Sequence, residues 1–281
     1  MRASVAPVKV IRMQEDVPSG ADDIIVVEEP LEIRLGYGPT EDRKEIPLSV
    51  TMRTPGNDAE LAVGFLYTEG IVKDPADVVR VVPCENVKPE ERGNVVRAEL
   101  HPSVELDPAR WQRNFYTSSS CGVCGKSSID AVHAQCDRPL GKVPSMGSAS
   151  ITALPERMHA AQTVFKHTGG IHAAALFNAA GELLIVREDV GRHNAVDKVI
   201  GALLASKPDN QQPTTDNLLL LVSGRAGFEL VQKCVVAGIP AMAAVGAPSS
   251  LAVQLAQDSG LLLIGFLRGD RFNVYAGKLA D

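Results

Sequence analysis

Residues 218–269, "LLLLVSGRAGFELVQKCVVAGIPAMAAVGAPSSLAVQLAQDSGLLLIGFLRG", decide the fold that the sequence predicts. Three apolar runs, at 218–224, 240–246 and 261–269, alternate with two segments of helical periodicity, at 227–238 and 249–260. Continuous apolar strands of this kind are typical of a parallel or mixed sheet that helices cover on both faces. The sequence therefore predicts an α/β unit in this region.

Helical and strand patterns continue upstream of this unit. Residues 154–167 have a helical pattern, 171–178 and 182–189 are strand-like runs joined by "AAG", and 194–206 are again helical. We therefore expect the α/β domain to span residues 138–281, with a mixed sheet between helices.

The first part of the chain is richer in strand signals. Residues 24–36 and 45–53 combine β-branched residues with partial alternation, and 78–83 and 94–102 are further candidates. Residues 54–72 predict a turn and a helix, with Asp58 as the helix cap and Leu61, Phe65 and Leu66 facing a core. We expect a smaller β-rich part over 1–115, joined to the α/β domain by a cysteine segment over 116–137.

Composition excludes several classes of protein. The chain has 281 residues, a net charge of −6 and 45% hydrophobic residues, which is ordinary for a globular protein and argues against a generic nucleic-acid or anionic-membrane surface. There is no apolar run of membrane-spanning length and no secretory signal core. Five cysteines, an odd number, do not suggest a disulfide framework. We expect a cytoplasmic protein that binds neither nucleic acid nor membranes.

The segment "TSSSCGVCGKSSID", residues 117–130, places Cys121 and Cys124 three positions apart. The segment "KSSIDAVHAQ", residues 126–135, predicts a helix, and the unpaired N–H groups and dipole of a helix N-terminus favour thiolate over thiol. The surrounding Ser and Thr residues cannot build a core, so we expect an exposed, mobile loop. These features favour nucleophilic sulfur chemistry.

Zinc is the main alternative for the same cysteines. Cys121, Cys124, His133 and Cys136 have the spacing C-x2-C-x8-H-x2-C, which can supply four ligands to a closed structural site. A thioredoxin-like redox site is disfavoured because no strand leads directly into the motif. From these residues alone, a zinc-stabilised nucleotide-binding or cofactor-binding chaperone without sulfur transfer stays open.

The loops after the predicted strands suggest a ligand site. In open α/β sheets, ligands bind beyond the carboxyl ends of strands, where helix N-termini present free N–H groups. The loops here are Gly-rich and carry Arg225, Arg268 and Arg271, whose guanidinium groups suit phosphate. Simple turns with solvated arginines would give the same pattern, so both interpretations stay open.

A polar run, "VREDVGRHNAVDKVIG" at residues 186–201, lies between a predicted strand and helix. It is either a solvated loop or a polar wall of the ligand crevice, with His193 available for proton transfer or a phosphate contact.

Several long motifs together resemble the formate dehydrogenase accessory sulfurtransferase family (FdhD-type). They are "TPGNDAELAVGFLYTEGI", "SSSCGVCGK", "TGGIHAAAL", "REDVGRHNAVDKVIG", "SGRAGFELVQKCVVAGIP" and "LIGFLRGDRFNVYAG", spread over residues 54–277. The resemblance implies a homodimeric sulfur carrier with a cytidine-deaminase-like α/β domain. Such a carrier accepts persulfide sulfur from a cysteine desulfurase. It delivers the sulfur to the molybdenum or tungsten cofactor of formate dehydrogenase, for molybdenum Mo-bis(molybdopterin guanine dinucleotide).

The resemblance also implies roles for particular residues. Cys121 matches the family's persulfide cysteine and Cys124 its companion. The family's cofactor-binding segment matches Phe266, Leu267, Arg268, Gly269, Asp270 and Arg271, and we expect Ser223, Gly224 and Arg225 to contribute to the same site. The H-x-E…P-C-x-x-C signature of zinc deaminases is absent, so deaminase chemistry and an intrinsic metal are not expected.

Overall fold

The computed structural model describes residues 2–106, 139–206 and 214–279. The sequence-predicted residues Cys121, Cys124, His133 and Cys136 lie outside these ranges.

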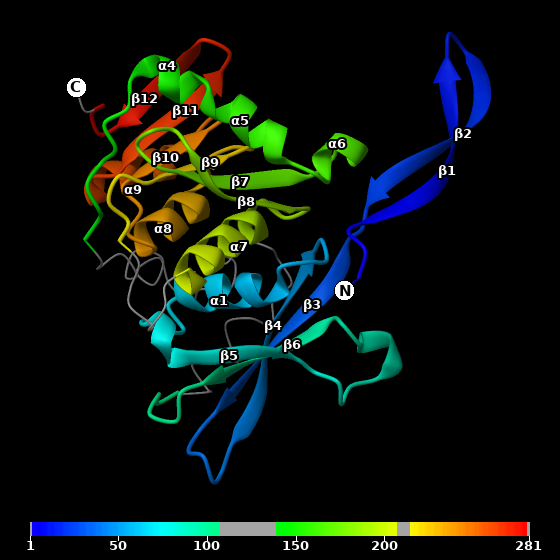
Figure 1. Cartoon of the computed structure of the whole chain (residues 1–281), viewed down its shortest axis with the longest axis vertical. Helices are drawn as coiled ribbons and strands as arrows, with labels where there is room; N and C mark the ends of the chain where they lie inside the picture. The colour runs from blue at the N-terminus through cyan, green and yellow to red at the C-terminus, as the bar shows by residue number, and fades with distance from the viewer. Residues whose placement is uncertain (1, 107–138, 207–213, 280–281) are drawn as a thin grey trace.

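In the described part of the C-terminal region, six strands form a mixed sheet (Figure 1). Its strand order is β12-β11-β10-β9-β7-β8, in which β9, β10 and β11 are parallel and the other neighbouring pairs are antiparallel. The strands are β7 (His172–Phe177), β8 (Leu183–Asp189), β9 (Leu219–Val222), β10 (Ala241–Ala244), β11 (Leu262–Arg268) and β12 (Arg271–Ala276).

Helices cover both faces of this sheet. One face packs against α4 (Ser148–Thr152) and α5 (Leu154–Ala161), and the other against α7 (Arg192–Ala205), α8 (Phe228–Val236) and α9 (Ser250–Ser259). Alternate residues of β9 pack into the cores on opposite faces of the sheet. Leu219 and Leu221 face α4 and α5, whereas Leu220 and Val222 face α7, α8 and α9. The predicted mixed α/β fold is confirmed, since apolar strands buried on both faces require this arrangement.

A second sheet lies below α7 in Figure 1, in the first part of the chain. Its described strands have the order β4-β3-β6-β5, with β3 (Glu29–Tyr37), β4 (Lys44–Arg53), β5 (Val78–Pro83) and β6 (Val95–Leu100). Short 3-10 turns span Pro75–Asp77 and Pro89–Glu91. Helix α1 (Asp58–Thr68) lies between this sheet and α7, as Figure 1 shows.

The two parts of the chain share a hydrophobic core. The largest buried cluster combines Leu35, Leu66 and Leu100 from the first part with residues of α7, α8 and the six-stranded sheet. The division into parts at 115 and 138 stays a prediction.

An extended hairpin was not predicted. Strands β1 (Val5–Gln14) and β2 (Val17–Val26) pair only with each other among the described strands and project away from the body in Figure 1. Both turn residues, Glu15 and Asp16, have positive φ, which matches a tight hairpin turn. The single strand expected over 24–36 is therefore wrong, because the run is divided between β2 and β3.

The predicted cap of α1 is also wrong. Asn57, with φ 58°, is the N-cap, and Asp58 is the first helical residue. The Asp58 carboxylate instead accepts hydrogen bonds at 2.9 and 3.1 Å from Arg53, whose side chain is fully buried. A buried guanidinium needs a compensating charge, and this need outweighs the capping preference. The predicted inward direction of Leu61 and Leu66 is confirmed.

The remaining described helix is α6 (Phe165–Thr168). None of the helices in the described ranges is both long and apolar enough to cross a membrane.

Candidate functional site

The carboxyl ends of four strands meet at one edge of the six-stranded sheet. Because β7 is antiparallel to both β8 and β9, β8 runs in the same direction as β9, β10 and β11. The helices α7, α8 and α9 begin directly after β8, β9 and β10, so their N-termini lie at this edge. Such an edge, with several helix N-termini, suits an anionic ligand.

The predicted loops at this edge touch one another. The amide of Gly246 donates to the carbonyl of Gly224 at 2.9 Å, and the amide of Phe266 donates to the carbonyl of Gly246 at 3.0 Å. A Cβ at position 246 would lie only 2.9 Å from the Gly224 oxygen, so this approach requires glycine. The segments 223–225 and 266–271 therefore belong to one continuous surface.

A cavity of about 350 Å³ opens beside the end of β11, lined by Phe266, Arg268, Arg271 and Asn273. Arg268 donates from Nε to the carbonyl of Val245 at 3.0 Å, which fixes its stem and leaves the rest of the guanidinium exposed. Arg271 is exposed as well. Two guanidinium groups at one cavity favour a phosphate-bearing ligand.

Phe266 has an unusual backbone conformation in this cavity. Its φ is 52°, at a bulge where the register of β11 and β12 shifts, and its side chain is 41% exposed. The left-handed region is unfavourable for a bulky residue, and such strain is concentrated at functional sites. The neighbouring Leu267 is fully buried in the core. The side chain of Leu267 thus anchors the 266–271 segment in the core, and only the backbone of Leu267 is available to a ligand.

The residues of the predicted segment 223–225 differ in what they contact. The Ser223 hydroxyl accepts a hydrogen bond from the amide of Ala173 at 2.9 Å, which ties β9 to β7. Arg225 is exposed, and Gly224 lies beside His172. The structure thus brings Arg225 and the 266–271 segment to one edge, and their role as cofactor ligands stays a prediction.

The polar run of residues 186–201 is mostly a buried junction, so the solvated-loop interpretation is wrong. Asp189 is fully buried and pairs with Lys198 at 2.7 Å, and it also accepts from the amides of Thr54 and Gly191. Asn194 bridges Asp189 to the carbonyl of Met52. Mixed polarity in the sequence does not distinguish a solvated loop from a buried network, because the partners in residues 51–54 are remote along the chain.

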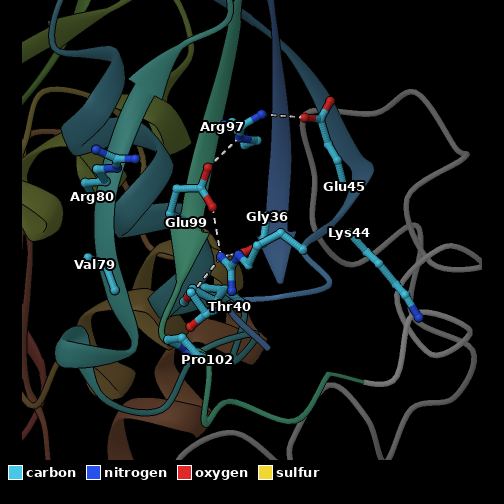
Figure 2. Close-up of a pocket in the computed structure, with 11 residues that line it drawn as sticks. Gly36, Thr40, Lys44, Glu45, Val79, Arg80, Arg97, Glu99 and Pro102 are labelled. Atoms are coloured by element: carbon cyan, nitrogen blue, oxygen red, sulfur yellow. Dashed lines mark hydrogen bonds and ion pairs between the residues drawn. The ribbon is translucent and has the colours of Figure 1, made fainter. Parts of the chain in front are cut away.

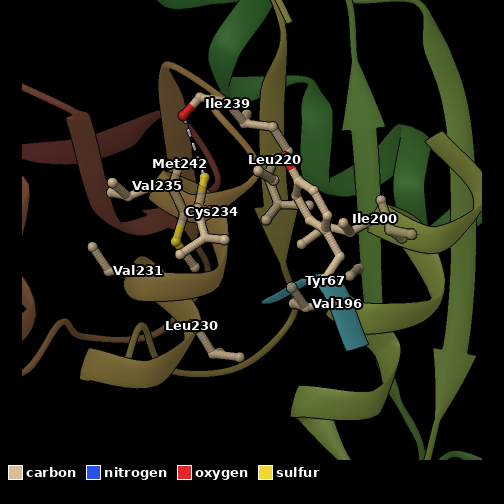
Figure 3. Packing of buried hydrophobic residues seen from close by; sticks show 14 of the residues in the cluster. Tyr67, Val196, Ile200, Leu220, Leu230, Val231, Cys234, Val235, Ile239 and Met242 are labelled. Atoms are coloured by element: carbon tan, nitrogen blue, oxygen red, sulfur yellow. Dashed lines mark hydrogen bonds between the residues drawn. The ribbon is translucent and has the colours of Figure 1, made fainter. Parts of the chain in front are cut away.

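Two cysteines fall within the described ranges. Cys234 is fully buried among apolar side chains of the shared core, as Figure 3 shows, and burial raises the pKa of its thiol. Cys84 is half-buried, and burial also raises its pKa. Both thiols are held in the protonated form and are poor nucleophiles, as expected for Cys84 and Cys234 as ordinary small hydrophobic residues.

A larger cavity of about 590 Å³ lies against the four-stranded sheet, and sequence reasoning missed it (Figure 2). Its arginine Arg97 is paired: Figure 2 shows Arg97 between Glu45 and Glu99, and it donates to them at 2.8 and 2.6 Å. The hydrogen bond from Arg97 lowers the pKa of Glu45. Because the carboxylates Glu45 and Glu99 lie among the cations of this cavity, the carboxyl edge is the better candidate for an anionic ligand.

Comparison with known proteins agrees with these features. The model of the FdhD/NarQ family matches residues 26–280. The Sulfur carrier protein FdhD of Streptomyces coelicolor is 49% identical over 273 residues, covering 96% of this chain and 93% of the relative. That of Mycobacterium tuberculosis is 48% identical over 260 residues, covering 90% of each chain.

A solved structure has the same fold. The crystal structure of a protein from Desulfotalea psychrophila, described as a formate dehydrogenase accessory protein, superposes with a TM-score of 0.73. Its sequence identity is 24%, and 98% of each chain is covered. Together with the family match over most of the sequence, these similarities mean that the chain belongs to the FdhD/NarQ family.

Proposed function

We propose that this protein is a sulfur carrier required for formate dehydrogenase activity. It accepts persulfide sulfur from a cysteine desulfurase and delivers it to the Mo- or W-bis-pyranopterin guanine dinucleotide cofactor. It acts as a cytoplasmic homodimer, with Cys121 as the persulfide carrier and Cys124 as its companion. The observation that carries the proposal is the near-full-length similarity to relatives named sulfur carrier proteins.

The described cysteines support this assignment by elimination. Of the five cysteines, Cys84 and Cys234 have thiols whose pKa burial raises. Thiolate is the form that attacks a persulfide, so these two are poor carriers. The raised pKa values thus favour one of the remaining three cysteines as the carrier, and among these the pair Cys121 and Cys124 matches the family's motif.

The carboxyl edge supports the acceptor part of the proposal. A guanine dinucleotide has a diphosphate, and Arg268 and Arg271 at the 350 Å³ cavity can each make charge-assisted hydrogen bonds to phosphate. The ring of Phe266, which is 41% exposed, is available for a flat contact with a base.

The sulfur-carrier assignment is tested by intact-mass spectrometry after incubation with a cysteine desulfurase and cysteine. The wild-type chain should gain sulfur mass that a reductant removes, and Cys121→Ala should not. Cys84→Ala is the matched control and should gain the same mass as wild type, because its thiol is protonated. An equal adduct on Cys121→Ala would refute the assignment. One tightly bound zinc per chain, held by the four candidate ligands, would instead support the chaperone alternative.

The cofactor site is tested by calorimetry with GDP. A charge-assisted contact contributes roughly 1.5–3 kcal/mol, so Arg268→Gln or Arg271→Gln should weaken binding about tenfold or more. Arg12→Gln, an exposed arginine on the β1–β2 hairpin, should bind GDP as wild type does. Unchanged affinity in both cavity variants would exclude this cavity as the nucleotide site.

A further inference from the structure

The β1–β2 hairpin is the most exposed element in the described part of the chain. Its two ten-residue strands pair only with each other among the described strands, and they project away from the body in Figure 1. Most of their residues are exposed, although α6 contacts β2. A two-stranded hairpin alone in water is at best marginally stable, so a hairpin of this length calls for a surface to pack on.

The strand register gathers exposed apolar residues on one face of the hairpin. Residues directly opposite each other in an antiparallel pair share a face, as do alternate residues of each strand. We call the hairpin face the set of four cross-strand pairs Pro7–Ile24, Lys9–Asp22, Ile11–Gly20 and Met13–Pro18. All these residues are exposed, Ile11 by 73% and Met13 by 61%. The opposite face is more sheltered, since Val8, Val10 and Ala21 are half-buried there.

The charges of the hairpin face match a second copy of the same face. Lys9 and Asp22 are its two charged residues, and they lie side by side at 2.5 Å with side chains 86% and 76% exposed. Turning a second copy by 180° about an axis parallel to the strands brings each residue of β1 opposite the β2 residue that is its own cross-strand partner. Lys9 of each copy then meets Asp22 of the other, as in an isologous interface.

The shape of the hairpin face matches itself about the same axis. Ile11 stands beside Gly20, and no heavy atom lies within 4 Å of the position that a Cβ would take at Gly20. The two-fold rotation places the Ile11 side chain of each copy over this open space in the other. A large side chain and a bare position thus alternate in the way that lets two faces interdigitate.

The hairpin face is also large enough for a specific contact. It has five apolar side chains, and burying one of this size removes on the order of 100 Å² from water. Two such faces would together bury roughly 1,000 Å², the size at which a specific interface begins. Because an exposed ion pair contributes little affinity, the apolar residues would supply most of the binding, and Lys9 and Asp22 would set the orientation.

We propose that the hairpin face is an interface between two copies of this chain, related by a two-fold axis parallel to β1 and β2. Lys9 of each copy pairs with Asp22 of the other, and Ile11 of each copy packs over Gly20 of the other. This inference rests on the homodimer of the proposed function and names its interface. A face that matches itself in both charge and shape fits a second copy better than an unrelated protein.

The first test is the oligomeric state of the full chain, measured by sedimentation velocity over a range of concentrations. Wild type should form a dimer. Ile11→Ser/Met13→Ser should raise the dimer Kd about a hundredfold or more, since four apolar side chains per dimer are lost from the interface. Both residues are exposed, so the variant should keep the wild-type circular dichroism. Val79→Ser/Leu184→Ser, at exposed apolar residues of β5 and β8, is the matched control and should dimerise as wild type does.

Charge exchange tests the pairing itself. In a homodimer of Lys9→Asp, or of Asp22→Lys, like charges meet across the two-fold axis, so each variant alone should dimerise at least about tenfold more weakly. An equimolar mixture should form a heterodimer, because every carboxylate of one chain then meets an ammonium of the other. The lost ion pair within each hairpin cannot explain this rescue, since it is missing from both chains. Lys88→Asp, in the exposed Lys88–Glu91 pair, should leave dimerisation unchanged.

The outcomes separate the interface from the proposed function. A dimer that persists in Ile11→Ser/Met13→Ser, or charge variants whose mixture associates no better than each alone, would overturn the interface and leave the homodimer intact. A monomeric wild-type chain would overturn both, and the hairpin would then belong to a partner of another kind. Sulfur loading of Cys121 is read separately by intact mass, so its failure would refute the sulfur carrier and leave the interface standing.

Discussion

At the scale of single residues, the candidate site combines strain with rigid support. Phe266 is held in the left-handed region, while the adjacent Leu267 is fixed in the core and Arg268 is bound to a backbone carbonyl. The strained residue is thus held by its neighbours, which is the condition under which such strain persists.

This strain can be measured by comparing two substitutions at position 266. Phe266→Ala and Phe266→Gly both remove the ring, but only glycine adopts φ 52° without a Cβ penalty. We expect Phe266→Gly to be more stable than Phe266→Ala by about 1 kcal/mol in urea denaturation, and both to bind GDP more weakly than wild type. If alanine is the more stable of the two, the backbone at 266 is not strained.

The sequence predicted that segments 223–225 and 266–271 lie at one edge of the sheet, but not their backbone conformation or burial. The motif "FLRGDR" indicated the segment, but the positive φ of Phe266 and the burial of Leu267 follow from the bulge between β11 and β12, which no local pattern reveals. The polar run of residues 186–201 was recognised in the sequence, but its burial was not, because its partners Met52 and Thr54 are remote along the chain.

At the scale of secondary-structure elements, the sequence predicted best where burial determines the pattern. The strands and helices of 218–269 were all correct, because each strand is buried on both faces and reads as a continuous apolar run. The β1–β2 hairpin was missed because most of its side chains are exposed, including Ile11 at 73% and Met13 at 61%, so no buried face imposes a pattern.

The packing of α1 on α7 depends on two glycines. A Cβ at Gly64 would overlap the carbonyl oxygen of Asp197, and a Cβ at Gly201 would overlap that of Glu60. The two helix backbones are therefore in direct contact, and each glycine faces the backbone of the other helix. Because α1 belongs to the first part of the chain and α7 to the second, this contact fixes how the two parts join.

We expect Gly64→Ala to destabilise the protein by about 3 kcal/mol or more, since backbone atoms cannot rotate away from the added methyl group. The measurement is the free energy of unfolding in urea. Gly20→Ala is the control: no heavy atom lies within 4 Å of a Cβ at that position, so the change should stay within about 1 kcal/mol. A well-tolerated Gly64→Ala would mean that α1 and α7 are further apart than the structure indicates.

At the scale of the whole molecule, a buried charge cluster connects three helices. Lys233 of α8 donates to Thr68 and Glu69 at the end of α1 and to Asp197 of α7, at 2.8, 3.0 and 3.0 Å. It is only 4% exposed. Burial alone would lower its pKa, but the carboxylates of Asp197 and Glu69 outweigh this effect and raise it to about 12. The ammonium is therefore the stable form, and it joins the two parts of the chain.

Replacing Lys233 tests whether the two parts unfold as one unit. Lys233→Met leaves two buried carboxylates uncompensated, which costs about 3–5 kcal/mol. Since the hydrophobic core also spans both parts, we expect one calorimetric transition in wild type and one, at lower temperature, in the variant. Exposed Lys73→Met should shift the transition little. In the folded protein, the pKa of Lys233 lies above its ordinary value of 10.5. The stability that the Lys233 ammonium contributes is therefore complete below pH 10.5 and is lost as the pH rises toward 12. This alkaline loss should be absent in Lys233→Met. Two separate transitions in the variant would show that Lys233, rather than the shared core, couples the parts.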